Sequence, residues 1–503
     1  MPGMEARRKA HMPLRDEWCD LARKLDWSFS YADERQVYPE ALSGSPWLEA
    51  HEWRDWDEPF RSTFAEYVST QQKKEVSFQA VAEAVGRVED LSQLDPGWLS
   101  VVKLHMATLP LAEFAAVIGN LRAARFGRDS AWRMTSLLGA LDELRHTQLP
   151  LRAMHDLVRW DEQFEWTHRL FHSNDWVAVA GRHLVDELLL GSDAIEFAIG
   201  THFVFETGFT NLQFIGLTTM AKQVGDRLFE QMLQSIQTDE ARHAQIGHPV
   251  LKKLVQRDPV RAQRLVDKWF WRSFRFFAVV TGFAMDYLAP LSARRASFKE
   301  FVEEWVVDQF KSSLDELGLQ LPRYWQAFLD ALPIYHHMLY ASAYTYRATT
   351  WFDFVLPGPE EQAWLAEKYP ETWPQLAPVW HNITERWRAS GPGVEWYTHG
   401  TTPVGFCNLC QLVLCGGTPS QNSAVFVQKP GRRYVFCSEP CRELFEAEPE
   451  RYAAHQGVVE RILHGQAPAN LLELLRYFGL SEANFGRDVH SGDYPFLREQ
   501  GSR

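Results

Sequence analysis

Apolar positions recur at helical spacing along most of the chain between residues 99 and 345. The pattern predicts four long helices over 99–126, 131–150, 194–222 and 224–247, followed by more helices from 260 to 345. Proline and glycine clusters between 355 and 405 break this regularity. Residues 404–456 then alternate like short strands around cysteines, and a last helix is expected over 468–478. The chain is therefore expected to be mainly α-helical.

A chain of 503 residues is too long for one hydrophobic core. The pattern divides it into an N-terminal helical extension, a core of long helices, a linker with a helical segment, and a small C-terminal α+β module with its tail. The corresponding ranges are 1–98, 99–355, 356–403 and 404–503.

Composition and charge narrow the function. A net charge of −13 argues against a nucleic-acid-binding protein, which would carry basic patches. The N-terminus lacks the apolar core of a signal peptide, and the longest apolar run, residues 276–290, is broken by Thr281, Gly282 and Asp286, so no membrane span is expected. Six cysteines without a signal peptide favour a reduced cytoplasm over a disulfide scaffold.

One short motif occurs twice, as DELRH at 142–146 and DEARH at 239–243. Each copy places a Glu and a His three residues apart, on one face of a helix: Glu143 with His146, and Glu240 with His243. A lone Glu in an apolar segment precedes each pair by 30 and 34 residues, at Glu113 and Glu206. Two Glu-x-x-His helices and two single-Glu helices supply the ligands of a di-iron or di-manganese carboxylate site in a ferritin-like four-helix bundle.

The neighbours of these ligands have expected roles as well. Asp142 and Asp239 are expected to accept the free ring N–H groups of the histidines, crosswise between the two motifs, which would fix the orientation of the rings. Arg145 and Arg242 would balance the negative charge. A single Glu-x-x-His is more often a surface pair, but two copies with matching upstream glutamates indicate a metal site. Carboxylate and imidazole ligands suit iron in oxygen activation.

With these residues in hand, the chain resembles the bacterial multicomponent monooxygenases. The similarity is to the hydroxylase α subunit of the four-component toluene and alkene monooxygenases. It rests on family-specific stretches that include WSFSYADERQVYPE, EYVSTQQKKE, FETGFTNLQFIGL and SIQTDEARHAQ, and it extends from about Trp18 to Gly479. The resemblance implies a cytoplasmic enzyme that activates O2 at a di-iron centre and inserts one oxygen atom into a small aromatic hydrocarbon such as toluene. Epoxidation of short alkenes such as isoprene is the alternative.

The resemblance also assigns individual residues. Glu113, Glu143 and His146 would hold one iron, and Glu206, Glu240 and His243 the other. Thr210 matches the family's active-site threonine, whose hydroxyl would relay protons; its alternative is a bond back to the Glu206 carbonyl. Asn211 and Gln237 match polar positions that respond to the effector protein. Pro110, where relatives carry a non-proline residue, is expected to kink its helix or to mark the first turn. Residues on the same helix faces would line an apolar substrate pocket: Leu109, Ala112, Ala116, Phe205 and Phe214.

Cys407, Cys410, Cys437 and Cys441 form a second constellation whose spacing predicts a structural zinc site. The surrounding residues resemble a YHS-type module. The alternative is four reduced, buried thiols, with Cys415 as a substitute ligand or a bystander.

The chain has no dinucleotide-binding fingerprint and no iron–sulfur cysteine pattern. Electrons from NAD(P)H are therefore expected to arrive through a partner reductase and, by resemblance, a Rieske-type ferredoxin. The resemblance further implies an effector protein and β and γ subunits in an (αβγ)2 assembly. A radical-generating or desaturase-like enzyme and a non-catalytic iron-storage bundle remain as competing interpretations.

Overall fold

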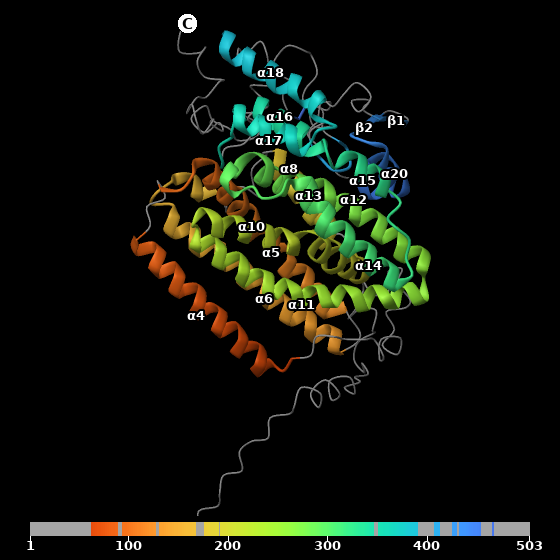
Figure 1. Ribbon diagram of the computed structural model, residues 1–503. Helices are drawn as coiled ribbons and strands as arrows, with labels where there is room; N and C mark the ends of the chain where they lie inside the picture. The colour runs from red at the N-terminus through yellow and green to blue at the C-terminus, as the bar shows by residue number, and fades with distance from the viewer. Residues whose placement is uncertain are drawn as a thin grey trace, which may run out of the picture.

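A computed structural model describes residues 62–88, 93–126, 130–166, 176–190, 192–346, 351–390, 407–412, 425–429, 432–453 and 465–466. The helix expected over 468–478 and residues 1–61 of the N-terminal extension lie outside these ranges. Within the described ranges the protein is a stack of helices with one two-stranded antiparallel sheet (Figure 1). The predicted mainly α class is confirmed.

The four predicted core helices are present. They are α5 (Pro96–Phe126), α6 (Ser130–Leu157), a continuous run of α9 (Ala194–Phe197), η5 (Ala198–Thr210) and α10 (Asn211–Val224), and α11 (Arg227–Arg257). The ends predicted for α6 and α11 are too early, because both helices continue through a proline, Pro150 or Pro249. Pro110 also lies inside α5, so of the two expectations for this residue, a kink or a first turn, the first turn is excluded.

The third core helix departs from regular α geometry. Residues 198–210 form a π-helix, a wider turn that is often found at functional sites. Asp193 caps the start of the run by accepting hydrogen bonds from the backbone N–H groups of Ile195 and Glu196. Gly225 ends the run at φ +84°, and Asp226 caps α11 directly afterwards. The π-helix therefore lies between two fixed ends.

Other helices enclose this core. Helix α4 (Phe64–Val88) lies along α11 and α6, and α12 (Pro259–Phe283) packs against η5. The remaining described helical elements are η3 (Glu162–Trp166), α8 (Trp176–Val185), η4 (Asp186–Leu190), η6 (Ala284–Leu288), η7 (Leu291–Ala293), α13 (Phe298–Phe301), η8 (Val302–Val307), α14 (Asp308–Leu317), α15 (Trp325–Ala331), α16 (Tyr335–Tyr346), α17 (Pro359–Lys368) and α18 (Trp373–Ser390).

The C-terminal module contains β1 (Val425–Lys429), β2 (Arg432–Phe436), α20 (Glu439–Ala447) and α21 (Pro449–Ala453). The two strands pair antiparallel, with Val425 opposite Phe436, as the alternating sequence predicted. The module lies beside α12 and α15 in Figure 1. The bonds from Trp271 and Arg275 on α12 to cysteines of the module confirm that contact.

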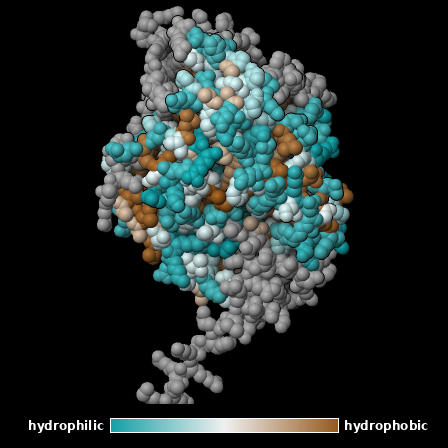
Figure 2. Space-filling view, viewed as in Figure 1, coloured by the Kyte–Doolittle hydropathy of each residue, from teal (hydrophilic) through white to brown (hydrophobic). Residues whose placement is uncertain are grey.

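The surface in Figure 2 is largely hydrophilic, with apolar side chains in small groups. One described helix, Pro96–Arg125, is long and apolar enough to cross a membrane, and 61% of its most apolar window is buried inside the protein. A second segment passes the same test only if Pro259–Leu288 and Leu291–Leu317 are joined across a bend of 113°. Burial explains the apolar character of Pro96–Arg125, which is the core helix α5.

Candidate metal centre

The two motifs face each other from neighbouring helices, α6 and α11. His146 Nδ1 lies 3.2 Å from Glu143 Oε2 of its own motif and 3.1 Å from Glu240 Oε1 of the other. His243 Nδ1 lies 3.5 Å from Glu240 Oε2 and 3.3 Å from Glu143 Oε1. Each of the two motif glutamates therefore directs one oxygen at each histidine, which is the arrangement of a carboxylate that bridges two ions.

The single glutamates close the two ends of the cluster. Glu113 on α5 has its Oε2 atom 3.7 Å from His146 Nδ1, and Glu206 on η5 has its Oε2 atom 4.0 Å from His243 Nδ1. All six residues named from the sequence are thus brought to one place, with Glu113 beside the first histidine and Glu206 beside the second. Except for the partly buried Glu113, they are buried.

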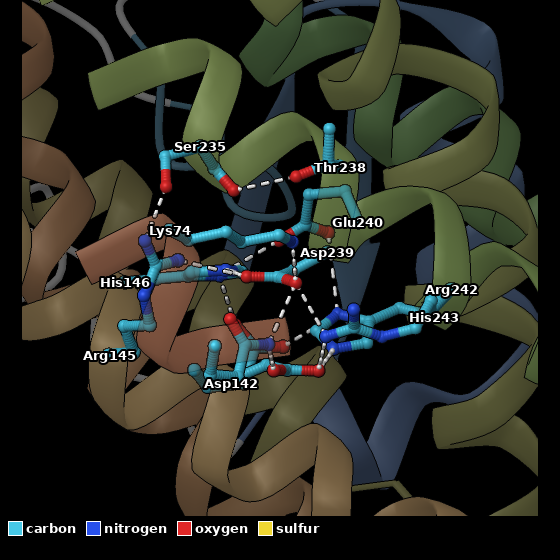
Figure 3. A network of polar contacts seen from close by, with 12 residues as sticks. Lys74, Asp142, Arg145, His146, Ser235, Thr238, Asp239, Glu240, Arg242 and His243 are labelled. Carbon is cyan, nitrogen blue, oxygen red and sulfur yellow. Dashed lines mark hydrogen bonds and ion pairs between the residues drawn. The ribbon is translucent and has the colours of Figure 1, made fainter. Parts of the chain in front are cut away.

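The far sides of the two imidazole rings meet the aspartates crosswise. His146 Nε2 lies 3.2 Å from Asp239 Oδ2, and His243 Nε2 lies 3.3 Å from Asp142 Oδ2 (Figure 3). Arg145 Nη1 is 2.9 Å from Asp239 Oδ2, and Arg242 Nη2 is 2.6 Å from Asp142 Oδ2. Because Nε2 donates to a carboxylate, each Nδ1 is left as a lone-pair donor directed at the cluster.

Helix α4 supplies contacts that sequence reasoning did not identify. Tyr67 donates its hydroxyl to Asp142 Oδ1 at 2.8 Å. The Gln71 amide donates to Asp142 Oδ1 at 2.5 Å and to Asp239 Oδ1 at 2.9 Å, and Lys74 forms an ion pair with Asp239. The only signal was that these residues fall in the family-like stretch EYVSTQQKKE. Helix α4 therefore fixes the positions of Asp142 and Asp239, the two aspartates that orient the histidines.

A third histidine, also missed, lies beside the cluster. His202 is one turn before Glu206 on the π-helix, and its Nδ1 atom is 2.6 Å from Glu206 Oε2. Its ring centroid is 5.7 Å from that of His243. The detectable signal in the sequence was a His four residues before a candidate ligand, a spacing that shares a helix face.

The electrostatics of the cluster favour bound cations. Burial raises the pKa of Glu143 well above its usual range. Although burial alone would lower the pKa of His146 and His243, their carboxylate neighbours raise both well above the ordinary value. Three buried glutamates and the partly buried Glu113 carry negative charge that two neutral imidazoles do not offset, which is costly in an apolar interior unless cations neutralise it.

The donor atoms also fit a pair of metal ions. Glu240 Oε2 and His243 Nδ1 are buried without a hydrogen-bond partner among the described residues. At this cluster the structure contains two groups of residues whose ligand atoms, one from each residue, lie within 4.8 Å of one another. One group is Glu113, Glu143, His146 and Glu240, and the other is His202, Glu206 and His243. The two groups have no residue in common, but Glu143 and Glu240 contact both motif histidines and so connect them, which matches the requirements of a dinuclear carboxylate site.

A cavity of about 120 Å³ opens beside the cluster. An apolar cavity of roughly 150 Å³ in another protein holds benzene, so a small hydrocarbon is the right scale of occupant. Glu113, Glu206 and Glu240 lie in its wall, together with Thr210. All five residues predicted to line the pocket are among its lining residues: Leu109, Ala112, Ala116, Phe205 and Phe214.

The three polar residues singled out beside the ligands differ in setting. Thr210 lines the cavity, and its hydroxyl is 3.5 Å from the Glu206 carbonyl oxygen, at the limit of a hydrogen bond. That weak bond leaves the hydroxyl able to turn toward the cavity. Asn211 and Gln237 are half-buried, and the Asn211 Oδ1 atom has no hydrogen-bond partner in the described part of the chain.

The four cysteines also come together, as free thiols, against α12. Cys410 Sγ is 3.8 Å from Cys437 Sγ, which is 3.4 Å from Cys441 Sγ. Thiolates bound at 2.3 Å to one tetrahedral ion would stand about 3.8 Å apart. Arg275 donates to Cys437 Sγ at 3.1 Å and Trp271 to Cys441 Sγ at 3.3 Å, so α12 offers positive charge and donors to sulfur. Cys415 lies outside the described residues.

Comparisons with known proteins agree with this geometry. The model of the methane/phenol/alkene hydroxylase family matches residues 27–258. The chain is 40% identical to the oxygenase component subunit alpha of an alkene monooxygenase system from Xanthobacter autotrophicus, over 95% of this chain and 97% of that protein. The chain belongs to this family. It is accordingly a hydroxylase α subunit of the soluble di-iron monooxygenase type, which decides against iron storage.

Two further similarities support the family. The oxygenase component DmpN of a phenol 2-monooxygenase from Pseudomonas is 28% identical over 93% of this chain and 91% of its own length. A crystal structure of phenol hydroxylase from Pseudomonas sp. OX1 superposes with a TM-score of 0.83 at 26% identity, covering 96% of this chain and 98% of that one. The ferritin-like bundle predicted from the repeated motif is thereby confirmed.

Proposed function

We propose that this chain binds two iron ions and oxidises small unsaturated hydrocarbons with O2. Glu113, Glu143 and His146 would hold one iron, and Glu206, Glu240 and His243 the other, with Glu143 and Glu240 shared. When bound, the iron pair supplies O2 activation. One oxygen atom enters the hydrocarbon and the other leaves as water, with two electrons delivered from NAD(P)H by partner proteins.

The protein's own residues prepare this chemistry in three ways. Asp142 and Asp239 fix the two imidazole rings, so that both Nδ1 atoms point into the cluster. The largely apolar cavity wall excludes water and binds a small hydrocarbon by desolvation. Thr210, weakly tied to the backbone, offers a hydroxyl between the cavity and Glu206 that can pass a proton.

The cavity beside the carboxylates is the observation that carries the substrate class. Its volume of about 120 Å³ and its largely apolar wall suit both a methylbenzene and a short alkene. The sequence favoured aromatics first, whereas the relative that is 40% identical along the chain acts on alkenes. We therefore place short alkenes, oxidised to epoxides, beside toluene-like aromatics, oxidised to phenols, as the substrates to test.

Exposed apolar side chains support the proposed partner subunits. They recur at helical spacing on α5 and α6, two helices that pack along each other. Exposed apolar surface marks protein–protein contacts, so these side chains fit cover by β or γ subunits in an (αβγ)2 assembly. The residues are Phe114, Ile118, Leu121, Leu137, Leu141, Leu144 and Leu151. The proposed partners also include an effector protein, a Rieske-type ferredoxin and a reductase, and the proposed location is the cytoplasm.

The cysteine cluster is proposed to hold one structural zinc ion. A site with four thiolates has no open coordination position, so its role would be to join the C-terminal module to the core. The positive charge of Arg275 and the N–H group of Trp271 would compensate for the double negative charge of such a site.

Product analysis tests the proposed function. The assembled complex, supplied with its ferredoxin, reductase and NADH, would be given but-1-ene or toluene under 18O2, and the products identified by mass spectrometry. The expected result is an epoxide or a cresol that carries one 18O atom. Unlabelled product, or consumption of NADH without any oxygenated hydrocarbon, would contradict the proposal.

A further inference from the structure

Besides its carboxylates and three threonines, the cavity is lined by one pair of polar side chains that bond to each other. His105 on α5 and Gln213 on α10 both line it, and Gln213 Nε2 lies 2.8 Å from His105 Nε2. Both residues are buried, with 2% and 5% of their surface exposed. Most of the surrounding wall is aliphatic or aromatic. Two buried polar side chains in such a wall need a reason beyond packing.

The hydrogen bonds of His105 and Gln213 show which of their polar atoms are already paired. His105 Nδ1 is 2.7 Å from the Val101 carbonyl oxygen, which can only accept, so Nδ1 carries the proton. Burial lowers the pKa of His105 to about 4, so the ring is neutral and its Nε2 accepts from Gln213. Among the described residues, the Gln213 amide has no other hydrogen bond. One N–H and the carbonyl oxygen of Gln213 thus remain available to an occupant of the cavity.

The position of the pair sets the size of that occupant. His105 precedes Glu113 by eight residues, and Gln213 follows Glu206 by seven. On both helices the pair is therefore two turns from the carboxylates, or roughly 10–12 Å along the axis. A molecule of four or five carbon atoms can lie between the two ends.

We propose that Gln213, held by His105, is a hydrogen-bonding subsite for the oxygen atom of a small oxygenated hydrocarbon. The occupant is an unsaturated alcohol bound as substrate, with its double bond toward the carboxylates, or an epoxide or phenol product on its way out. This proposal rests on the proposed hydrocarbon oxidation and adds to it a preference for occupants with one polar end.

Two substrates that differ by one hydroxyl test this subsite. The reconstituted complex is assayed with but-1-ene and but-3-en-1-ol, and the ratio of kcat/KM for alcohol over alkene is measured. A purely apolar pocket would reject the alcohol by roughly 10- to 100-fold, because its hydroxyl would be buried unpaired. The wild-type ratio is expected to stay within about fivefold of one, and to fall about tenfold in Gln213→Met, which keeps the volume and removes the amide.

Controls separate the outcomes. Leu184→Met changes the apolar wall and is expected to leave the alcohol-to-alkene ratio as in wild type. If the subsite holds product, inhibition by added 1,2-epoxybutane weakens in Gln213→Met; if it holds substrate, the alcohol's kcat/KM falls. A wild-type enzyme that rejects the alcohol 100-fold and is not inhibited by added 1,2-epoxybutane overturns the subsite even if Gln213→Met does not fold. An unchanged ratio together with unchanged inhibition in a folded variant does the same. Failure to oxidise any hydrocarbon would instead contradict the proposed function.

A different observation concerns His202. Two donors about 2.1 Å from one octahedral ion and adjacent on it stand about 3.0 Å apart. The N···O distances among the motif residues, 3.1–3.5 Å, are close to that value. The distance from His202 Nδ1 to Glu206 Oε2 is 2.6 Å, which is that of a charge-assisted hydrogen bond.

We infer that His202 is a positioning residue that fixes the Glu206 carboxylate through Oε2, the oxygen that lies toward His243, and so keeps this carboxylate beside the cluster. Gly247 on α11 allows this helix to pack directly against the backbone at His202. A Cβ atom there would lie 2.4 Å from the backbone N of Phe203 and 2.7 Å from the carbonyl carbon of His202, so only glycine lets α11 approach the π-helix this closely.

Mössbauer spectra of iron-57 protein test this role apart from activity. His202→Leu removes the donor and is expected to keep two irons per chain while altering the quadrupole splitting of one of them. His202→Asn places an amide N–H near the position of Nδ1 and is expected to restore the wild-type spectrum. Loss of one iron in both variants would make His202 a ligand and overturn the positioning role, as would a wild-type spectrum in His202→Leu.

Discussion

His146 on α6 directs its Nε2 atom at Asp239 on α11, across the interface between the two motif helices, at 3.2 Å. The reciprocal pair, His243 with Asp142, measures 3.3 Å. Each motif therefore orients the histidine of the other, and the two halves of the cluster depend on each other.

Replacing one of these aspartates is expected to weaken metal binding. In Asp239→Asn, His146 loses its charged acceptor while Lys74 and Arg145 lose their partner. Loss of such an outer partner typically lowers metal affinity by about 10- to 100-fold. Iron retained per chain after dialysis against a chelator measures the effect. Asp156→Asn, near the end of α6 and away from the cluster, is the control, and equal iron retention in both variants would refute the orienting role.

Gly247→Ala is expected to disturb the π-helix. The added methyl would overlap the backbone at His202 and Phe203, which cannot move like a side chain. Overpacking of this kind costs about 1–3 kcal/mol. Gly86→Ala, where the nearest atom is 3.7 Å away on a flexible arginine, is the control and should not lower the melting temperature. Equal melting temperatures for the two variants would argue against a tight contact.

His105 predicts a component of acid sensitivity. The unfolded chain protonates this residue below a pH of about 6.5, whereas burial lowers its pKa to about 4 in the folded protein. Its contribution to stability is thus complete above pH 6.5 and is lost as the pH falls from 6.5 through 4. At pH 5 the loss is about 2 kcal/mol.

The measurement is the fall in melting temperature between pH 7 and pH 5. That fall should be smaller in His105→Gln than in wild type. It should not change in His155→Gln, whose side chain is 81% exposed. An identical fall in His105→Gln and wild type would show that the buried ring is not a source of acid sensitivity.

The cysteine cluster predicts one zinc ion per chain. Cys441→Ser should lose the zinc and loosen the C-terminal module from α12, because Trp271 and Arg275 would lose the site they contact. Metal analysis and limited proteolysis of the module measure both effects. Cys415→Ser is the control and should keep its zinc. A Cys441→Ser protein with full zinc content would exclude Cys441 as a ligand.

The sequence predicted the core of this site because the ligand motifs are short and local. A Glu and a His three residues apart define a helix face, and the repetition of that pair defines two helices that must face each other. The crosswise contacts of Asp142 and Asp239 follow from the same geometry. Helix ends were less predictable, because packing carries α6 and α11 through prolines that usually end a helix.

The contacts that were missed depend on tertiary packing. Gln71 reaches Asp142 and Asp239 across 71 and 168 residues of sequence, and no periodicity encodes that meeting. The hydrogen bond between His105 and Gln213 likewise joins two helices at a distance of 108 residues. His202 is the exception, because its contact with Glu206 lies within one helix and the spacing of four residues was readable in the sequence.

Metal content and Mössbauer spectroscopy of the assembled complex, grown on iron-57, test the central claim most directly. Two spin-coupled irons per chain are predicted, and the Glu240→Ala variant should lose this coupled pair while remaining largely helical. A single uncoupled iron or none in properly assembled protein would contradict the account, as would full retention of two coupled irons in Glu240→Ala.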